Sequence, residues 1–334
     1  MWKKILLAVL LLAILIAGGT VGYLYTRKPA SAPPLTIKVD MSPQRIARGK
    51  YLFENVSDCE GCHSQHDETR FGRPVLANGR GVGFVFPMGL GLPGKVVAPN
   101  ITPDPETGIG NWTDGEKIRA IREGIGKDGR ALFPMMPYAL FRGMSDEDVQ
   151  SMVAYMNTLP PVKNALPRTA LSFPVSLLIS SAPRPVGSVP PPDRMNKLKY
   201  GEYLATIAGC VGCHTQEVKG QLVLEKQFAG GREFRLPNGV VVTANISPDP
   251  ETGIGRWSEQ QFIEKFYQYK EYDEKGSPQV GPEGVTLMPW LALSRLPPED
   301  LGAIYTYLKT QQPAHNAVET HPGFTKPPEP SKGS

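Results

Sequence analysis

The first 28 residues are the most continuously apolar part of the chain. An uncharged run of 21 residues, Ile5–Tyr25, lies between two pairs of basic residues. At about 1.5 Å per helical residue this run is roughly 31 Å long, enough to cross a hydrocarbon core. Ala30-Ser31-Ala32 has the form of a signal-cleavage site, but it follows the charged residues and precedes two prolines. We therefore predict a retained transmembrane anchor over residues 1–28 and a linker over residues 29–41.

From residue 42 onward, the apolar positions predict short helices separated by long loops, and the same unit occurs twice. Each unit contains three predicted helices, and capping residues mark where they start. The first helix is predicted over residues 43–56 and 197–208, the second after the capping boxes Thr113-x-x-Glu116 and Ser258-x-x-Gln261, and the last after Ser145 and at Pro297-Pro298.

The similarity between the two units is concentrated in a few motifs. Residues 100–110 match residues 245–255 with one Thr-to-Ser change, and Met136-Pro137-Tyr138 matches Met288-Pro289-Trp290. Residues 42–160 are called the first repeat below and residues 194–312 the second repeat, and each is predicted to form one domain. Gly49 with Tyr155, and Gly201 with Tyr307, occupy matching positions on the first and last predicted helices. Each pair either allows the two helices to cross closely or consists of ordinary core residues.

Proline-rich segments separate and follow the repeats. Residues 161–193 are predicted to be an extended linker, and residues 313–334 a tail that is disordered or draped over a surface. Within the linker, Leu171–Ile179 is apolar but too short to span a membrane. We expect this stretch to pack within the protein; the alternatives are contact with the membrane surface or with a partner.

Composition and charge narrow the functional classes. The chain of 334 residues contains 35 glycines and 34 prolines, which is typical of a loop-rich protein with few long regular elements. Its formal net charge of +4 is small and spread along the chain, so it does not indicate a nucleic-acid partner.

All four cysteines belong to one motif that is present in both repeats. Cys59-Glu60-Gly61-Cys62-His63 recurs 151 positions later as Cys210-Val211-Gly212-Cys213-His214. Cys-x-x-Cys-His is the attachment signature of c-type haem. The two thiols reach the two vinyl groups of one haem, and the histidine points at the iron as its proximal ligand. We therefore predict two covalently attached haem c groups.

Other chemistries of the same cysteines are less consistent with the pattern. A redox dithiol is expected beside a βαβ unit, which surrounds neither motif. A zinc site needs four ligands, whereas each motif supplies three candidates in one short loop. A disulfide within each motif would leave the following histidine unexplained in both repeats.

The repeats also predict a methionine as the sixth ligand of each iron. Met288 is the only methionine after the second motif and lies just before the last helix, where class I cytochromes place this ligand. Met136 aligns with Met288 and is likewise followed by proline. The first repeat offers further candidates, of which Met135 is nearest in register: Met88, Met135, Met144, Met152, Met156 and His66.

Methionine ligation bears on function. A thioether stabilises ferrous iron and raises the reduction potential. With both axial positions filled, neither iron keeps an open site for a substrate, which favours an electron carrier without catalytic residues over a haem enzyme.

Two further groups of residues have two interpretations each. The loops containing Asn100 and Asn245 either line a haem edge or are tight turns formed by Pro, Asp and Gly. Four arginines are able to pair with haem propionates, but we expect them to be solvated surface charges: Arg119, Arg122, Arg130 and Arg142.

With these motifs the chain resembles the cytochrome c subunits of membrane-bound dehydrogenases, such as quinoprotein alcohol dehydrogenase and gluconate dehydrogenase. The resemblance is closest over residues 100–110, 122–129, 136–138 and 144–161, and it covers both repeats. It implies a mostly α-helical fold with two tandem class I-like cytochrome c domains. The implied haem ligands are Cys59, Cys62, His63 and Met136 for one haem, and Cys210, Cys213, His214 and Met288 for the other.

The chain departs from that family in its expected organisation. Those subunits usually carry one more haem domain and a C-terminal anchor, whereas the pattern here predicts two repeats and an N-terminal anchor. Because covalent haem is attached outside the bacterial cytoplasmic membrane, we expect a single-pass inner-membrane protein with its haem domains in the periplasm.

The expected function is electron relay between redox proteins at the membrane surface. The expected partners are a dehydrogenase, a quinol-oxidising complex, an oxidase or a photosynthetic reaction centre. The alternatives are a dihaem enzyme, such as a cytochrome c peroxidase or a thiosulfate-oxidising cytochrome, and a haem-bearing structural subunit.

Overall fold

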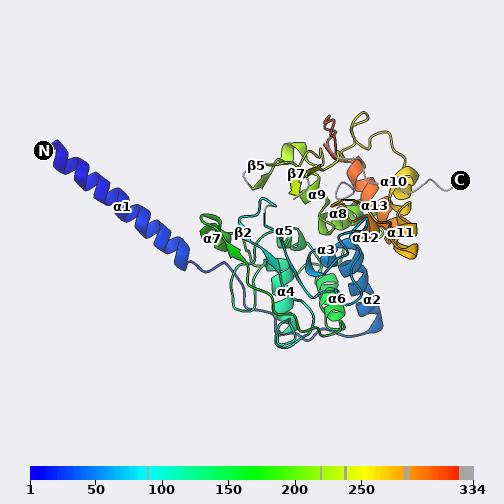
Figure 1. Ribbon diagram of the computed structural model, residues 1–334, viewed down its shortest axis with the longest axis horizontal. Helices are drawn as coiled ribbons and strands as arrows, with labels where there is room; N and C mark the ends of the chain where they lie inside the picture. Colours follow the sequence, from blue (N-terminus) through cyan, green and yellow to red (C-terminus); the bar gives the residue numbers. More distant parts are fainter. Residues whose placement is uncertain (89, 219, 237–238, 282–285, 323–334) are drawn as a thin grey trace.

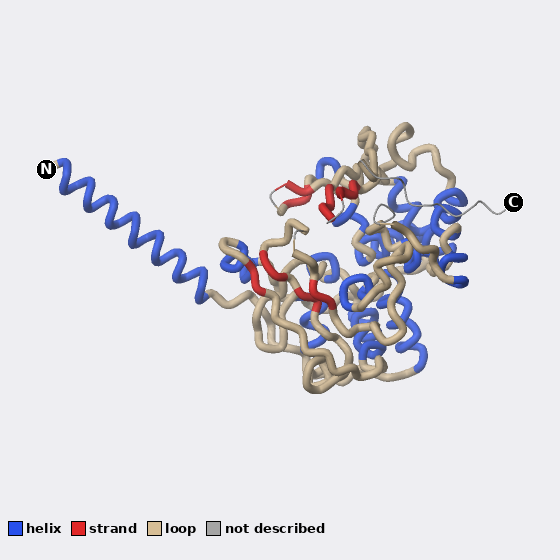
Figure 2. Tube along the Cα trace, viewed as in Figure 1, coloured by secondary structure: helices blue, strands red, loops and turns tan. Residues whose placement is uncertain are grey.

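The computed structural model describes the chain except for residues 89, 219, 237–238, 282–285 and 323–334. The protein is mostly helical, and long loops join the helices (Figures 1 and 2). The strands are short and form two-stranded antiparallel pairs. One helix, α1 (Trp2–Thr26), projects away from the body that contains both repeats (Figure 1).

Helix α1 has the properties predicted for the N-terminal segment. Its 25 residues give a length of about 37 Å, and none of them is buried. Among the described residues, α1 is the helix that is long and apolar enough to cross a membrane.

The elements of the first repeat match the predicted helices, with two additions. The first predicted helix changes to a π-helix in its last turn, and a short helix follows Met136-Pro137. The elements are α2 (Pro43–Tyr51), η1 (Leu52–Val56), α3 (Cys59–His63), β1 (Phe84–Val85), β2 (Gly94–Lys95), β3 (Val97–Ala98), α4 (Asp114–Glu123), α5 (Tyr138–Phe141) and α6 (Asp146–Met156).

The remaining elements belong to the linker and the second repeat. The linker holds β4 (Ala170–Leu171), α7 (Val175–Leu178) and the 3₁₀ turn η2 (Ile179–Ser181). The second repeat holds α8 (Lys197–Ile207), α9 (Cys210–Cys213), β5 (Glu217–Val218), β6 (Gln221–Leu222), η3 (Leu224–Lys226), β7 (Glu233–Leu236), β8 (Gly239–Val242), α10 (Glu259–Tyr267), α11 (Lys270–Lys275), α12 (Trp290–Ser294) and α13 (Pro298–Lys309).

The helix starts follow the predicted capping residues. Thr113 accepts a hydrogen bond from Glu116 N and its own N–H is bonded to the Glu116 carboxylate, and Ser258 with Gln261 forms the same capping box. Ser145 Oγ caps α6 by accepting from Asp148 N at 3.1 Å. These caps satisfy backbone N–H groups that a helix leaves unpaired in its first turn.

In each repeat the first helix crosses the last helix at a glycine. A Cβ on Gly49 would overlap the carbonyl oxygen of Ser151 and lie 2.8 Å from the Tyr155 Cβ, so α2 contacts α6 backbone directly. A Cβ on Gly201 would overlap the carbonyl of Ala303 on α13 in the same way. The predicted crossing is therefore present in both repeats. The nearest atoms belong to the equivalent residues Ser151 and Ala303, and Tyr155 of the first repeat also lies within 3 Å whereas Tyr307 is not among the nearest atoms.

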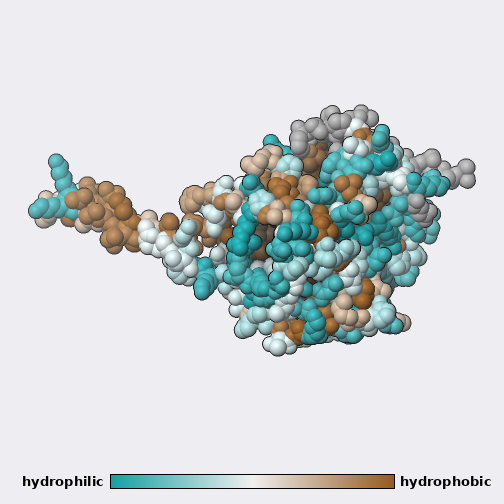
Figure 3. Space-filling model, turned by 60° about the horizontal axis from the view of Figure 1, so that its bottom comes forward, coloured by the Kyte–Doolittle hydropathy of each residue, from teal (hydrophilic) through white to brown (hydrophobic). Residues whose placement is uncertain are grey.

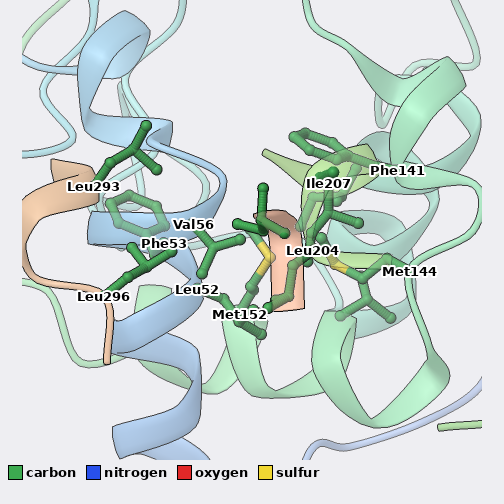
Figure 4. Close-up of a cluster of buried hydrophobic side chains, with 14 of the residues drawn as sticks. Leu52, Phe53, Val56, Phe141, Met144, Met152, Leu204, Ile207, Leu293 and Leu296 are labelled. Atoms are coloured by element: carbon green, nitrogen blue, oxygen red, sulfur yellow. The ribbon is translucent and has the colours of Figure 1, made fainter. Parts of the chain in front are cut away.

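The two repeats share one continuous apolar core. Figure 4 shows Leu52, Phe53 and Val56 of η1 in the same cluster as Leu204 and Ile207 of α8. Leu293 of α12, and Leu296 just before α13, lie against the η1 side chains in the same view. Burying these side chains holds the repeats together, because the full burial of each contributes on the order of 1.5–3 kcal/mol to the free energy of folding.

Polar contacts between the repeats are reciprocal. Tyr51 of α2 donates a hydrogen bond to Asp300 of α13, and Tyr203 of α8 donates to Asp148 of α6 at 2.6 Å. Tyr51 and Tyr203 occupy matching positions of the two repeats, as do Asp148 and Asp300. Arg48 also binds Asp148 through two hydrogen bonds of 2.8 Å.

The pKa of Asp148 reflects these partners. Burial alone would raise the pKa of this carboxyl, but the hydrogen bonds and positive charge of Arg48, with the Tyr203 hydroxyl, lower it below its ordinary value. Asp148 is therefore ionised in the folded protein.

Asp148→Asn is expected to lower the free energy of unfolding by about 3–5 kcal/mol near pH 7, because it leaves the Arg48 charge buried without its partner. The depressed pKa of Asp148 contributes stability above its unfolded value of about 4 that is lost as the pH falls. The difference between variant and wild type should therefore shrink below pH 4. Urea unfolding at several pH values measures this difference.

The control is Glu106→Gln, which removes an exposed ion pair with Lys163. It should lower the free energy of unfolding by less than about 1 kcal/mol.

The segment that follows each repeat is hydrogen-bonded to the matching loop of that repeat, residues 100–110 or 245–255. Asn100 Nδ2 donates to the Val162 carbonyl at 2.8 Å, and Asn245 Nδ2 donates to the Ala314 carbonyl at 2.7 Å. Asn316 N also donates to Thr252 Oγ1 at 2.9 Å. The first residues of the predicted tail are therefore draped on the second repeat, and residues 323–334 lie outside the described part of the chain.

Candidate haem-binding site

His63 is held by the backbone of the loop it faces. The residues Cys59–His63 form the short helix α3, and Asp58 in the left-handed conformation starts it, with its carboxylate accepting from Gly61 N at 3.2 Å. His63 is 8% exposed, and its Nδ1 lies 2.9 Å from the carbonyl oxygen of Pro99. Because a carbonyl only accepts, Nδ1 carries the proton and Nε2 is left with its lone pair free for a metal.

His214 repeats this arrangement in the second unit. Its Nδ1 lies 2.8 Å from the carbonyl oxygen of Ala244, and the side chain is also 8% exposed. Burial lowers the pKa of both imidazoles, which keeps them neutral as axial ligands must be. The same donor orientation in both repeats fits the proximal ligand of a haem.

The cysteines do not have the environment of a redox dithiol. Burial, together with the nearby Asp58 and with Cys213 of the second motif, raises the pKa of Cys62 to about 12. Burial also raises the pKa of Cys210 to about 12. Redox-active thiols have lowered pKa values. Nor do the described residues contain a group of three or more His, Cys, Asp or Glu side chains able to hold a metal ion, as a zinc site would need.

The two predicted methionine ligands lie in equivalent turns. Tyr138 N donates to the Met136 carbonyl at 2.8 Å, and Trp290 N donates to the Met288 carbonyl at 2.8 Å. Each proline that follows caps a short helix, α5 or α12. Met136 and Met288 are both half-buried against the apolar core.

A cavity of about 2170 Å³ lies between these parts of the two repeats. Cys62 borders it from the first repeat, and Cys213, His214 and Met288 border it from the second. In the first repeat, the neighbouring candidates Met135 and His66 also line this cavity, whereas Met136 packs against the core instead. The alternatives to Met136 therefore remain open.

A loop of the first repeat forms part of the cavity wall on the second repeat. Phe71 N donates to the Pro278 carbonyl at 3.0 Å, and Val280 N donates to the Thr69 carbonyl at 2.9 Å. The Phe71 ring stacks on Tyr269 at 5.2 Å between centroids, and Tyr269 stacks on Trp290 at 4.8 Å. Trp290 is two residues from Met288. Sequence analysis missed this wall, because contacts between residues about 200 positions apart leave no periodic pattern.

The loops that contain Asn100 and Asn245 are tight turns, and the second of them also borders the cavity. Asp104 Oδ1 accepts from Thr107 N at 2.6 Å, and Asp249 Oδ1 accepts from Thr252 N at 2.7 Å, so both loops are closed by the same side-chain bonds. In the second repeat, Asn245 and Thr252 also line the cavity. The loop of the second repeat is therefore both a tight turn and part of the cavity lining.

The expectation of solvated arginines is wrong for Arg119 and Arg122, which are buried. Arg119 Nη2 donates to the Gly126 carbonyl at 3.0 Å, and Arg122 binds Asp146 and the Gly187 carbonyl. These bonds fix the 124–130 turn and the linker, so the two side chains are structural. Arg130 is exposed as expected, and Arg142 is half-buried with a hydrogen bond to the Ala182 carbonyl.

Comparison with known proteins identifies relatives of the chain. Residues 46–160 match the family model "Cytochrome c". The chain is 32% identical over 290 residues to the cytochrome c subunit of alcohol dehydrogenase (quinone) from Gluconacetobacter polyoxogenes, covering 82% of this chain and 57% of the relative. It is 31% identical over 298 residues to the fructose dehydrogenase cytochrome subunit of Gluconobacter japonicus, covering 86% of this chain and 57% of the relative.

A further relative matches almost end to end. The chain is 29% identical over 314 residues to a "diheme cytochrome c-type" protein of Cereibacter sphaeroides, covering 89% of this chain and 95% of the relative. By contrast, the chain spans a little over half the length of the two dehydrogenase subunits. A cytochrome c domain implies a covalently bound haem c, for which the motif and the buried, oriented histidine of the first repeat are suited.

Proposed function

We propose that this chain, which belongs to the cytochrome c family through its domain at residues 46–160, relays electrons between redox partners at a membrane surface through two haem c groups. Cys59, Cys62 and His63 would hold one haem, with Met136 as sixth ligand. Cys210, Cys213, His214 and Met288 would hold the other. Each repeat would be one haem domain, with boundaries near residues 42–160 and 194–312.

The observation that carries this proposal is the equivalence of His63 and His214. Both rings are buried, both donate from Nδ1 to a backbone carbonyl, and both follow a Cys-x-x-Cys pair. The adjoining cavity of about 2170 Å³ exceeds the roughly 300–1,000 Å³ that is usual for a single small-molecule site. One cavity bordered by cysteines of both motifs supports two neighbouring cofactors.

The protein's own residues set what these sites do. When bound, haem c supplies a one-electron iron couple. The backbone carbonyls of Pro99 and Ala244 orient the histidines, and both histidine side chains are buried. Methionine in the sixth position would raise the reduction potential and close the site to substrates, which suits transfer of electrons rather than a reaction at the iron.

Helix α1 would anchor the chain in the bacterial inner membrane, with both repeats in the periplasm. Its length and composition suit a single crossing. The relatives named as dehydrogenase subunits make a dehydrogenase the first partner to test, followed by a quinol-oxidising complex, an oxidase or a photosynthetic reaction centre.

The haem content is tested by expressing the full chain in a host that attaches haem c. We expect two haems per chain by intact mass and by the haem absorbance of the alkaline pyridine complex. Cys210→Ala/Cys213→Ala should leave one, and Cys59→Ala/Cys62→Ala should leave the other. Two haems remaining in either variant would contradict the assignment of the motifs.

The relay is tested on the protein purified from its membranes in mild detergent. We expect a redox subunit to copurify and its substrate to reduce both haems of the chain. Methionine-ligated low-spin spectra are expected at both sites. High-spin haem at one site together with peroxide turnover would instead identify a haem enzyme and contradict the carrier function.

A further inference from the structure

The apolar part of the linker is not buried in the protein. This part is the segment Phe173–Ile179, which contains α7 (Val175–Leu178). Its side chains Phe173 and Leu178 are 74% and 53% exposed. The expectation that this stretch packs within the protein therefore holds only for one side of it, where Val175 and Leu177 are half-buried.

The segment is fixed to the body and lies beside the anchor. Strand β4 pairs with β2, with Leu171 opposite Gly94, and Ser172 N donates to the Pro93 carbonyl at 2.9 Å. Helix α7 in turn contacts α1. Figure 3 shows hydrophobic side chains on the part of the body next to the base of α1. The segment is thus held rigidly on the body and contacts the helix proposed to cross the membrane. This places its apolar surface at the level of the membrane surface.

The charged residues nearest the segment in sequence are all basic. The sequence has no Asp or Glu between Val149 and Pro192, and none before Asp40. Three exposed basic residues flank the segment: Lys28 after α1, Lys95 on the strand paired with β4, and Arg184 after η2. Basic residues around an apolar patch complement the negative surface of a membrane that contains anionic lipids.

We propose that Phe173–Ile179 is a second membrane contact, inserted among the headgroups of the membrane that α1 crosses. The proposal rests on the membrane anchoring proposed above. Phe173 and Leu178 enter the boundary between headgroups and acyl chains, and the flanking basic residues bind anionic headgroups. A single span leaves the body free to tilt and rotate, whereas a second contact fixes which face of the body meets the membrane.

This contact also orients the cavity. Val175 of α7 lines the cavity on the side of the first repeat, together with Phe86, Leu90 and Leu92. That rim of the cavity therefore faces the membrane surface. A membrane-embedded redox partner would approach the chain from the first repeat.

The test uses the full chain, with haem attached, in nanodiscs that contain a photoactivatable phosphatidylglycerol. After illumination, peptide mass spectrometry maps the lipid adducts. We expect adducts in α1 and in residues 171–181. Phe173→Ser/Leu178→Ser should reduce the adducts in residues 171–181 at least tenfold, because both side chains lose the apolar surface that they would bury in the lipid, and leave those in α1 unchanged. Met195→Ser/Leu224→Ser, at exposed apolar positions of the second repeat, is the matched control and should change neither.

The outcomes separate this proposal from the anchor itself. Adducts in α1 but not in residues 171–181 would overturn the second contact and leave the anchor standing, and the segment would then be a candidate surface for a protein partner. Adducts in neither segment would overturn the anchor as well. Equal labelling of residues 171–181 in nanodiscs whose other lipids are zwitterionic would overturn the part assigned to the basic residues.

Discussion

Met288→His is expected to lower the reduction potential of the haem proposed for the second repeat by roughly 100–300 mV, well within the range of about 0.8 V that axial ligands span. Imidazole is a harder ligand than a thioether, so it stabilises ferric iron relative to ferrous iron. The haem should stay attached, because the variant leaves Cys210, Cys213 and His214 in place. A spectroelectrochemical titration of the full chain should show one of its two waves displaced and the other unchanged.

The control for this variant is Met195→His, since Met195 is 94% exposed before α8 and is not among the residues that line the cavity. Both waves should then keep their positions. The same titration decides the ligand of the first repeat, because Met136→His should displace the other wave and Met135→His should not. If Met288→His leaves the titration unchanged, Met288 is not a ligand.

Gly49→Ala is expected to lower the free energy of unfolding by more than about 3 kcal/mol, a large part of the 5–15 kcal/mol that is usual for a folded domain. The added Cβ would overlap the backbone carbonyl of Ser151, which has no rotamer to move into. Helices α2 and α6 would have to separate, and the core between them would lose its packing. Gly201→Ala should have a similar effect through Ala303.

Gly187→Ala is the matched control for both glycine variants. A Cβ there meets no atom within 4 Å, so the free energy of unfolding should change by less than about 0.5 kcal/mol. Guanidinium unfolding followed by far-ultraviolet circular dichroism measures all three. If Gly49→Ala unfolded at the same denaturant concentration as Gly187→Ala, the close helix crossing would be wrong.

The sequence predicted the features that are encoded locally. Thr113, Ser145 and Ser258 start helices where their side chains cap the first turn, because a cap depends on residues three positions apart. The length and composition of residues 2–26 likewise determined helix α1. The change of the first helix to a π-helix at Leu52–Val56 was not predicted. The apolar positions of that segment fit a straight helix equally well.

Features that depend on distant parts of the chain were missed. The pairing of Phe71 with the second repeat, and the burial of Arg119 and Arg122, follow from how the repeats and the linker pack together. The choice between Met135 and Met136 has the same origin. Adjacent residues of a turn point in different directions, and alignment of the repeats alone does not determine which of them faces the cavity.

The reciprocal hydrogen bonds between the repeats have the form of an isologous interface. Tyr51 reaches Asp300 while its counterpart Tyr203 reaches Asp148, as in a two-fold symmetric homodimer in which residue i of each subunit meets residue j of the other. The chain thus has the organisation of a symmetric dimer written as one polypeptide. Because the linker makes association intramolecular, this interface needs far less affinity than a free dimer would. Unlike the identical subunits of a homodimer, the two repeats can differ in sequence, as Arg48 and its counterpart Tyr200 do.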